Sequence, residues 1–234
     1  MERVNAQGQI LKVSSAKENL LSLDNCVLST LEQPGSSSIF EVVDSGGLLR
    51  IQPNSNVLTL SINSSSSPEL TIFNSSIGNV VYELPYTPTA QTGLYIKGDS
   101  RAIISQTGST ISQLFIEKGT EHQEIHLQFR PTATYAIAGL ENGKTVNNIR
   151  IYIVNLNSSV PIASQGDLSL QISCTNIQLA SQTYEGSPSE NLVITSVLNG
   201  EIGKVSIPIL NAPDGAIIHI ETVISNVSIE RSTQ

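Results

Sequence analysis

The stretch that decides the fold is "NNIRIYIVNLN", residues 147–157, where apolar β-branched side chains alternate with polar ones. In an extended chain Ile149, Ile151 and Ile153 lie on the same face. A period of two is typical of a β-strand with one buried face, and it does not fit the 3.6-residue period of a helix. The stretch therefore predicts a strand, and the rest of the chain can be compared with it.

The same alternation recurs along most of the sequence, in about fifteen segments rich in Val, Ile, Leu and Thr. Turn sequences separate these segments: Asn-Gly pairs stand at 142–143 and 199–200, and Pro-Asp-Gly stands at 213–215. Many short strands without long helices predict an all-β protein. We expect two antiparallel β-sandwich or jelly-roll-like domains, or one large jelly roll with an added sheet.

The expected domain organisation follows from chain length, because no internal repeat is visible. Residues 1–40 are predicted to form an N-terminal arm or the first strands. Residues 41–118 and 119–234 are predicted to form two sandwich domains, divided near the Lys-Gly-Thr break at 118–120. One helical candidate exists, since "SAKE" (15–18) has capping-box spacing. A strand continuing to Cys26 is an equal alternative there.

Composition excludes some classes of function. Only 14% of the 234 residues are charged, the formal net charge is −8, and no run of Lys or Arg occurs. A nucleic-acid-binding surface needs a basic patch, so we expect no direct nucleic-acid partner. No apolar run approaches the ~18 residues of a membrane span, and no secretory signal is visible. We expect a chain that is made in the cytoplasm and needs no cofactor.

Two of the three histidines lie close together in "EHQEIHLQFR", residues 121–130. Its apolar positions alternate, so the segment is predicted to be a strand whose outward, solvated face carries His122, Glu124, His126, Gln128 and Arg130. Side chains four apart on a strand lie roughly 13 Å from each other. A metal ion needs ligand atoms at about 2 Å, so His122 and His126 cannot share one ion on a flat strand. His122, Glu124 and His126 remain the candidate metal ligands, with a pH-sensitive subunit contact as the alternative.

Other candidate residues are few. Tyr86 and Tyr95 flank a proline-bracketed loop and are the candidate contacts for a ligand or partner, with packed tyrosines as the alternative. Cys26 and Cys174 are expected to be small buried thiols in strands, and their pairing stays open. No nucleophile elbow, calcium loop or phosphate loop occurs.

These observations favour a non-enzymatic structural protein. We expect a self-associating homo-oligomer, such as a capsid, tail or decoration subunit located in a virion or another extracellular assembly. One alternative is an adhesin, pilus or surface-layer module that is exported to the cell surface. The second alternative is a metal-dependent enzyme on a jelly-roll scaffold, which would need a histidine to converge with a glutamate.

Overall fold

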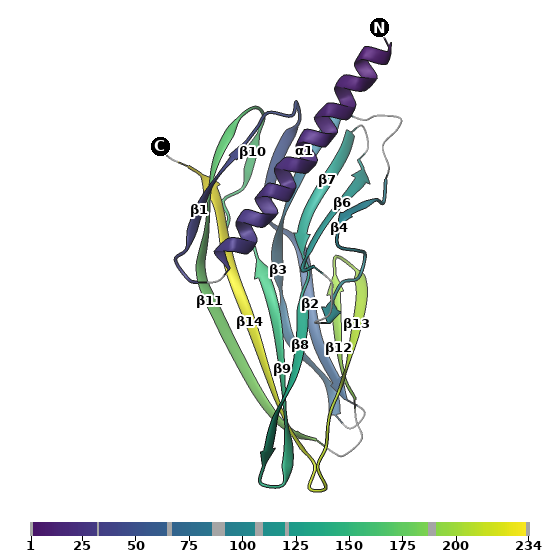
Figure 1. Ribbon diagram of the computed structural model, residues 1–234, viewed down its shortest axis with the longest axis vertical. Coiled ribbons are helices and arrows are strands. Elements are labelled where there is room, and N and C mark those ends of the chain that lie inside the picture. Colours follow the sequence, from purple (N-terminus) through teal and green to yellow (C-terminus); the bar gives the residue numbers. More distant parts are fainter. Residues whose placement is uncertain are drawn as a thin grey trace.

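The computed structural model describes residues 2–31, 33–64, 67–85, 92–105, 110–119, 122–186 and 191–232, in which one helix precedes fourteen strands (Figure 1). The helix is α1 (Glu2–Thr30). Sheet A contains, in spatial order, β1 (Ser37–Val42), β11 (Leu168–Gly186), β14 (Ala216–Arg231), β9 (Lys144–Asn155), β8 (Thr132–Glu141) and β5 (Ile104–Ser105). Sheet B contains β13 (Glu201–Pro208), β12 (Asn191–Leu198), β2 (Leu48–Ser64), β3 (Ser67–Pro85), β7 (His122–Phe129), β6 (Ser112–Lys118) and β4 (Tyr95–Lys97), and β10 (Ile162–Ser164) pairs with β2.

This architecture confirms the predicted all-β, two-sheet sandwich-like fold. Most neighbouring strands are antiparallel, but β14 runs parallel to β9 and β5 runs parallel to β8. The Asn-Gly turns also form as predicted, because Asn142 and Asn199 adopt the left-handed conformation, with φ of 50° and 52°.

The apolar side chains form two cores along the long axis of the molecule. The lower core, at the end opposite α1 in Figure 1, includes Ile149, Ile151 and Ile153 of β9. The upper core, under α1, includes the next residue, Val154, and then Leu156. Because adjacent residues of a strand point to opposite faces, sheet A presents one face to the lower core and the other face to the upper core.

Sheet B also changes its buried face, at the same position along the long axis as sheet A. Leu49 and Ile51 of β2 belong to the upper core, whereas Leu58 and Leu60 belong to the lower core. The β2–β3 register is irregular between these two pairs, where Gln52 pairs with Asn79 and Asn56 pairs with Ile77. The same side of sheet B therefore faces outward next to the upper core and is buried next to the lower core.

Strands from both parts of the sequence mix in each sheet. The expected boundary at 118/119 falls between β6 and β7, which pair with each other from Ser112↔Phe129 to Lys118↔Gln123. In sheet B, β3 also pairs with β7, and β2 pairs with β12. The long strands β2, β3, β9 and β14 contribute side chains to both cores.

The N-terminal segment differs most from expectation. The predicted strand up to Cys26 is wrong, and the predicted short helix is part of the 29-residue α1. Ser15 does not cap this helix, because it lies within it and its hydroxyl accepts a hydrogen bond of 3.0 Å from Ser45 Oγ. Both cysteines are free: Cys26 is half-buried on α1, whereas Cys174 is buried in β11, and burial raises the pKa of its thiol.

One face of α1 packs against the upper core through buried Ala16, Leu20, Leu23 and Val27. Buried polar groups fix its position: Asp24 pairs with Lys97 and accepts a 2.6 Å hydrogen bond from the Ser112 hydroxyl. Figure 1 shows the helix lying obliquely over the upper strands, with its N-terminal end beyond them. No helix in the part of the chain described above has the length and apolar character to cross a bilayer.

Candidate functional site on the outer face of sheet B

Three neighbouring strands of sheet B place glutamates side by side. Glu124 of β7 pairs with Glu83 of β3 on one side and with Glu117 of β6 on the other. His122 and His126 stand two residues before and after Glu124 on the same face of β7. The register of three strands thus forms a row of three carboxylates with a histidine on either side of the central one.

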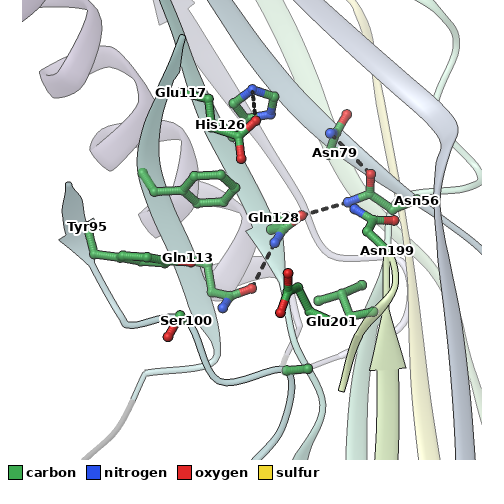
Figure 2. A pocket seen from close by; sticks show the side chains of 13 residues that line it. Asn56, Asn79, Tyr95, Ser100, Gln113, Glu117, His126, Gln128, Asn199 and Glu201 are labelled. Atoms are coloured by element: carbon green, nitrogen blue, oxygen red, sulfur yellow. Dashed lines mark hydrogen bonds and ion pairs between the residues drawn. The ribbon is translucent and has the colours of Figure 1, made fainter. Parts of the chain in front are cut away.

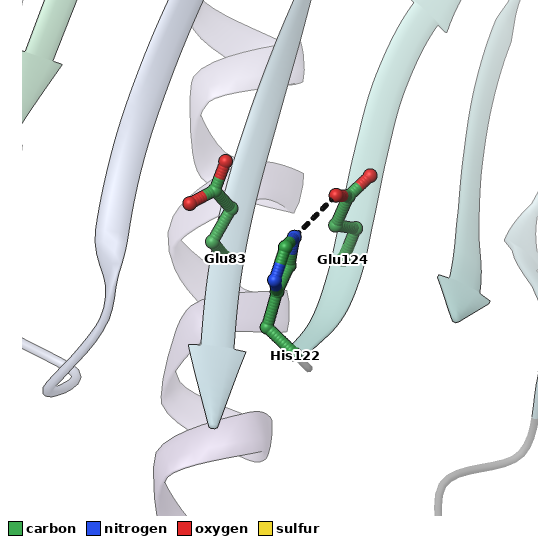
Figure 3. Close-up of side chains that lie close together, drawn as sticks. All are labelled: Glu83, His122 and Glu124. Atoms are coloured by element: carbon green, nitrogen blue, oxygen red, sulfur yellow. Dashed lines mark hydrogen bonds and ion pairs between the residues drawn. The ribbon is translucent and has the colours of Figure 1, made fainter. Parts of the chain in front are cut away.

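Glu124 contacts both histidines. Its Oε1 lies 2.6 Å from His122 Nε2, and its Oε2 lies 2.8 Å from His126 Nε2. Figure 3 shows His122 and Glu124 pointing toward each other, with Glu83 on the neighbouring strand. Glu83, His122 and Glu124 form one triad, and Glu117, Glu124 and His126 form another; in each, the potential ligand atoms lie within 4.8 Å of one another. The two histidines therefore belong to different triads that share Glu124.

The electrostatics of the two triads differ. Arg50 binds Glu83 with both its Nε and its Nη2, so this carboxylate already has a cationic partner. Glu117 instead lies beside an imidazole, because His126 Nε2 is 3.5 Å from its Oε2. Partial burial acts to raise the pKa of Glu124, but the hydrogen bonds with His122 and His126 outweigh it and leave the pKa below its ordinary value.

The predicted solvated face is wrong at one end of β7. His126 has only 13% of its side chain exposed, and Gln128 and Arg130 are buried. The cause is the change of buried face described above, which brings this end of the face next to the lower core. The Arg130 guanidinium donates hydrogen bonds to the Asp99 carboxylate and to the backbone carbonyls of Thr110 and Arg101.

A hollow of about 380 Å³ lies where sheet B changes its buried face. Figure 2 shows side-chain amides lining it, with Asn56 donating to Gln128 at 2.7 Å and Gln128 donating to Gln113 at 2.9 Å. Asn199 and Glu201 of the β12–β13 hairpin complete the opposite wall. The wall is thus built mainly of neutral donors and acceptors.

Aromatic rings form a row along one wall of this hollow. The centroid of Tyr95 lies 5.3 Å from that of Phe115, and Phe115 stacks on His126 at 5.2 Å with an interplanar angle of 9°. Burial raises the pKa of the Tyr95 hydroxyl. The structure places Tyr95 in this wall, beside the histidine cluster, whereas Tyr86 lies outside the described residues.

The third histidine lies away from this cluster. A second hollow, of about 610 Å³, lies on the outer face of sheet A, and His219 lines it. His219 Nδ1 lies 2.8 Å from the Thr183 hydroxyl, and the nearby Arg150 pairs with Glu221. No group of three metal-ligating side chains that includes His219 occurs in the described part of the chain.

The lower part of β11 is an open sheet edge. β1 pairs with β11 only as far as Ser173, and two more backbone hydrogen bonds, with Gly35 and Ser36, reach Cys174. Beyond that residue, the described strands pair with β11 on its β14 side only. Ala180 and Gln182 are exposed, although Thr222 and Ile220, their partners on the same face of β14, are buried. In the described part of the chain, residues 175–185 of β11 therefore have no strand along their outer edge, and one of their faces is exposed.

Sequence interpretation missed Glu83, Glu117 and Phe115 as site residues. Each lies in a segment whose alternation predicted a strand, but only the pairing of β3, β6 and β7 brings them to Glu124 and His126. The site offers imidazole and carboxylate ligands next to a hollow lined by amides and aromatic rings. Comparison of the chain with protein-family models, with curated proteins and with solved structures finds no match.

Proposed function

We propose that this chain is a non-enzymatic structural subunit that self-associates by β-strand addition at the open edge of β11. The observation that carries the proposal is segment 175–185 of β11, which pairs with β14 on one side and with none of the described strands on the other. It contains no Lys, Arg or Pro, and its only charged residue is Glu185 at the end. An exposed, long and uncharged strand edge is a template for pairing with another chain.

The outer edges of four other described strands carry protective features. β1 has six residues and carries Glu41, and β4 has three residues. β13 carries Lys204 and ends at Pro208. The free part of β8 is interrupted by a bulge at Gly139, where φ is +122°. Short length, charge, proline and bulges are the usual devices that prevent edge pairing. In β11 the register irregularity at Cys174–Asn176 and the charge of Glu185 lie at the two ends of the segment, and residues 177–184 between them carry none of these devices.

A second copy of the chain is a suitable occupant of the edge. Two β11 strands can pair antiparallel about a two-fold axis, which gives a closed dimer. With the axis near Ala180, Glu185 of one copy faces Thr175 of the other, so no like charges oppose each other. Sheet A then continues from one copy into the next.

The class of assembly that fits best is a virion, in which the chain would be a capsid, tail or decoration subunit, or another extracellular assembly. Support comes from the low charge content of 14% and from the abundance of Ser, Thr, Asn and Gln in the chain. Neutral polar side chains cost less free energy to bury between subunits than charged ones do.

The test is the molar mass of the full chain in solution over a range of concentrations, with electron microscopy of the same sample. We expect dimers or larger ordered assemblies for the wild type. Leu179→Lys introduces a positive charge at the open edge, where the side chain is 66% exposed, and is expected to yield monomers. Ile202→Lys, at 68% exposure on β13, is the matched control and should leave the assembly intact. A wild-type chain that stays monomeric at the highest concentration would refute the proposal.

A second candidate function is a surface-exposed binding module of the adhesin class. The row of Tyr95, Phe115 and His126 beside side-chain amides favours it, because aromatic faces and neutral hydrogen-bonding groups suit an uncharged polar ligand such as a saccharide. Saturation-transfer NMR with a panel of neutral saccharides tests it. Binding that Tyr95→Ala abolishes would support this function, and the absence of any signal would exclude it for that panel.

A further inference from the structure

The row of glutamates on sheet B places three carboxylates opposite one another. Like charges directly opposite each other on neighbouring strands are destabilising, and Glu83, Glu124 and Glu117 stand in this relation. Arg50 compensates Glu83, but in the described part of the chain Glu117 and Glu124 have ion pairs with histidine alone. A bound cation would remove the repulsion between these two carboxylates.

We propose that Glu117, Glu124 and His126 bind a divalent transition-metal ion of the zinc class. A tetrahedral site with bonds of about 2.0–2.1 Å needs ligand atoms about 3.3 Å apart. His126 Nε2 lies 2.8 Å from Glu124 Oε2 and 3.5 Å from Glu117 Oε2, so the two observed separations bracket that value. Small side-chain adjustments suffice to place one ion between the three groups.

The surroundings of His126 favour ligation. Its imidazole stacks on Phe115, which fixes the ring plane, and only 13% of its side chain is exposed. His126 and Glu117 both line the 380 Å³ hollow. Three protein ligands leave a fourth position for water or a bound molecule, and this position would face the hollow.

The chemistry of the ligands selects the ion. Imidazole suits Zn²⁺ and its neighbours in the first transition row, whereas Ca²⁺ prefers six to eight oxygen ligands. The other triad is a poorer site, because an ion there would have to displace the Arg50 guanidinium from Glu83. The ion is therefore assigned to the side of Glu124 that carries His126.

The experiment is calorimetric titration of the metal-free full chain with Zn²⁺ and, separately, with Ca²⁺. The wild type is expected to bind one Zn²⁺ and to bind Ca²⁺ at least about tenfold more weakly. Glu117→Gln and His126→Gln should each weaken Zn²⁺ binding by at least about tenfold, since even outer-shell changes cost 10–100-fold. Glu117 has 57% of its side chain exposed, so its substitution should not prevent folding.

Two further histidine variants complete the comparison. His219→Gln lies on sheet A, away from the cluster, and is the matched control that should keep wild-type Zn²⁺ affinity within about threefold. His122 is hydrogen-bonded to Glu124 but is not a proposed ligand, so His122→Gln should weaken Zn²⁺ binding less than His126→Gln does. Zn²⁺ should also raise the melting temperature of the wild type reversibly with EDTA, and Glu117→Gln should lose this shift. Absence of Zn²⁺ binding, equal affinity for Ca²⁺, or greater loss in His122→Gln than in His126→Gln would each overturn the assignment.

Discussion

The buried Arg130 guanidinium holds together residues that lie outside the helix and the strands. Its side chain is fully buried, and its guanidinium bonds to the Asp99 carboxylate and to the carbonyls of Thr110 and Arg101. Substitution Arg130→Met removes both guanidinium hydrogen bonds to the Thr110 carbonyl and the buried cationic partner of Asp99, whereas the Arg101 carbonyl still accepts from Gln113 Nε2. We therefore expect it to lower the free energy of unfolding by about 2–4 kcal/mol. Arg101→Met removes the other Arg–Asp99 pair, in which the arginine side chain is 57% exposed, and should cost only about 0–1 kcal/mol. Urea denaturation of both variants gives the comparison, and equal losses would contradict the role of burial.

Asp99 makes stability depend on pH at acid values. Hydrogen bonds from Arg101 and then Arg130 hold the pKa of its carboxyl well below the ordinary value of 3.8. The folded chain therefore releases this proton more readily than the unfolded chain. The resulting stabilisation is present above about pH 3.8 and is lost as the pH falls toward the lowered pKa. In Asp99→Asn, we expect the melting temperature to decrease less steeply with acid below pH 4 than in the wild type, and identical slopes would count against this account.

At the scale of elements, α1 illustrates why local sequence can mislead. Residues 20–28 contain a short apolar run that suits a strand or a helix, and the sequence left the two as equal alternatives. Packing determines that the segment is helical. In a helix, the spacing of Ala16, Leu20, Leu23 and Val27 places all four side chains on one face, which packs on the upper core. A helix of this length gains most of its stability from such tertiary contacts.

This account of α1 can be tested on the helix itself. Leu23 is 1% exposed, and we expect Leu23→Ala to lower the free energy of unfolding by about 2–5 kcal/mol through the cavity it creates. Leu11 lies on the same helix with 70% exposure, so Leu11→Ala should change stability by no more than about 0.5 kcal/mol. Chemical denaturation followed by far-ultraviolet circular dichroism measures both, and similar losses would show that α1 does not depend on its buried face.

At the scale of the whole molecule, the two cores are joined by continuous strands. β2, β3, β9 and β14 contribute to both, so loss of one core removes strand partners from the other. We expect a single cooperative unfolding transition. Leu127→Ala in the upper core and Leu60→Ala in the lower core should each move this one transition to lower temperature in calorimetry. Two transitions, each sensitive to one substitution, would instead indicate two independently folding parts.

Much of the fold was accessible from local sequence. The alternation in residues 147–157 correctly predicted β9, and the Asn-Gly pairs correctly predicted tight turns at Asn142 and Asn199. The strand containing His122, Glu124 and His126 was also predicted, together with their common face. Side-chain period and turn conformation are properties of consecutive residues, so a short window of sequence is enough to reveal them.

Tertiary structure alone decided which strands are neighbours and which face of each strand is buried. Glu83 and Glu117 reach Glu124 through pairing between strands that are separate in sequence. The two adjacent apolar residues Ile153 and Val154 shift the alternation of β9 by one position, but only the packing shows that they belong to different cores. The open edge of β11 likewise exists only because β1 ends its pairing at Ser173. Register and edge exposure depend on residues far apart in the chain, and the local pattern of one strand is the same whichever partner it finds.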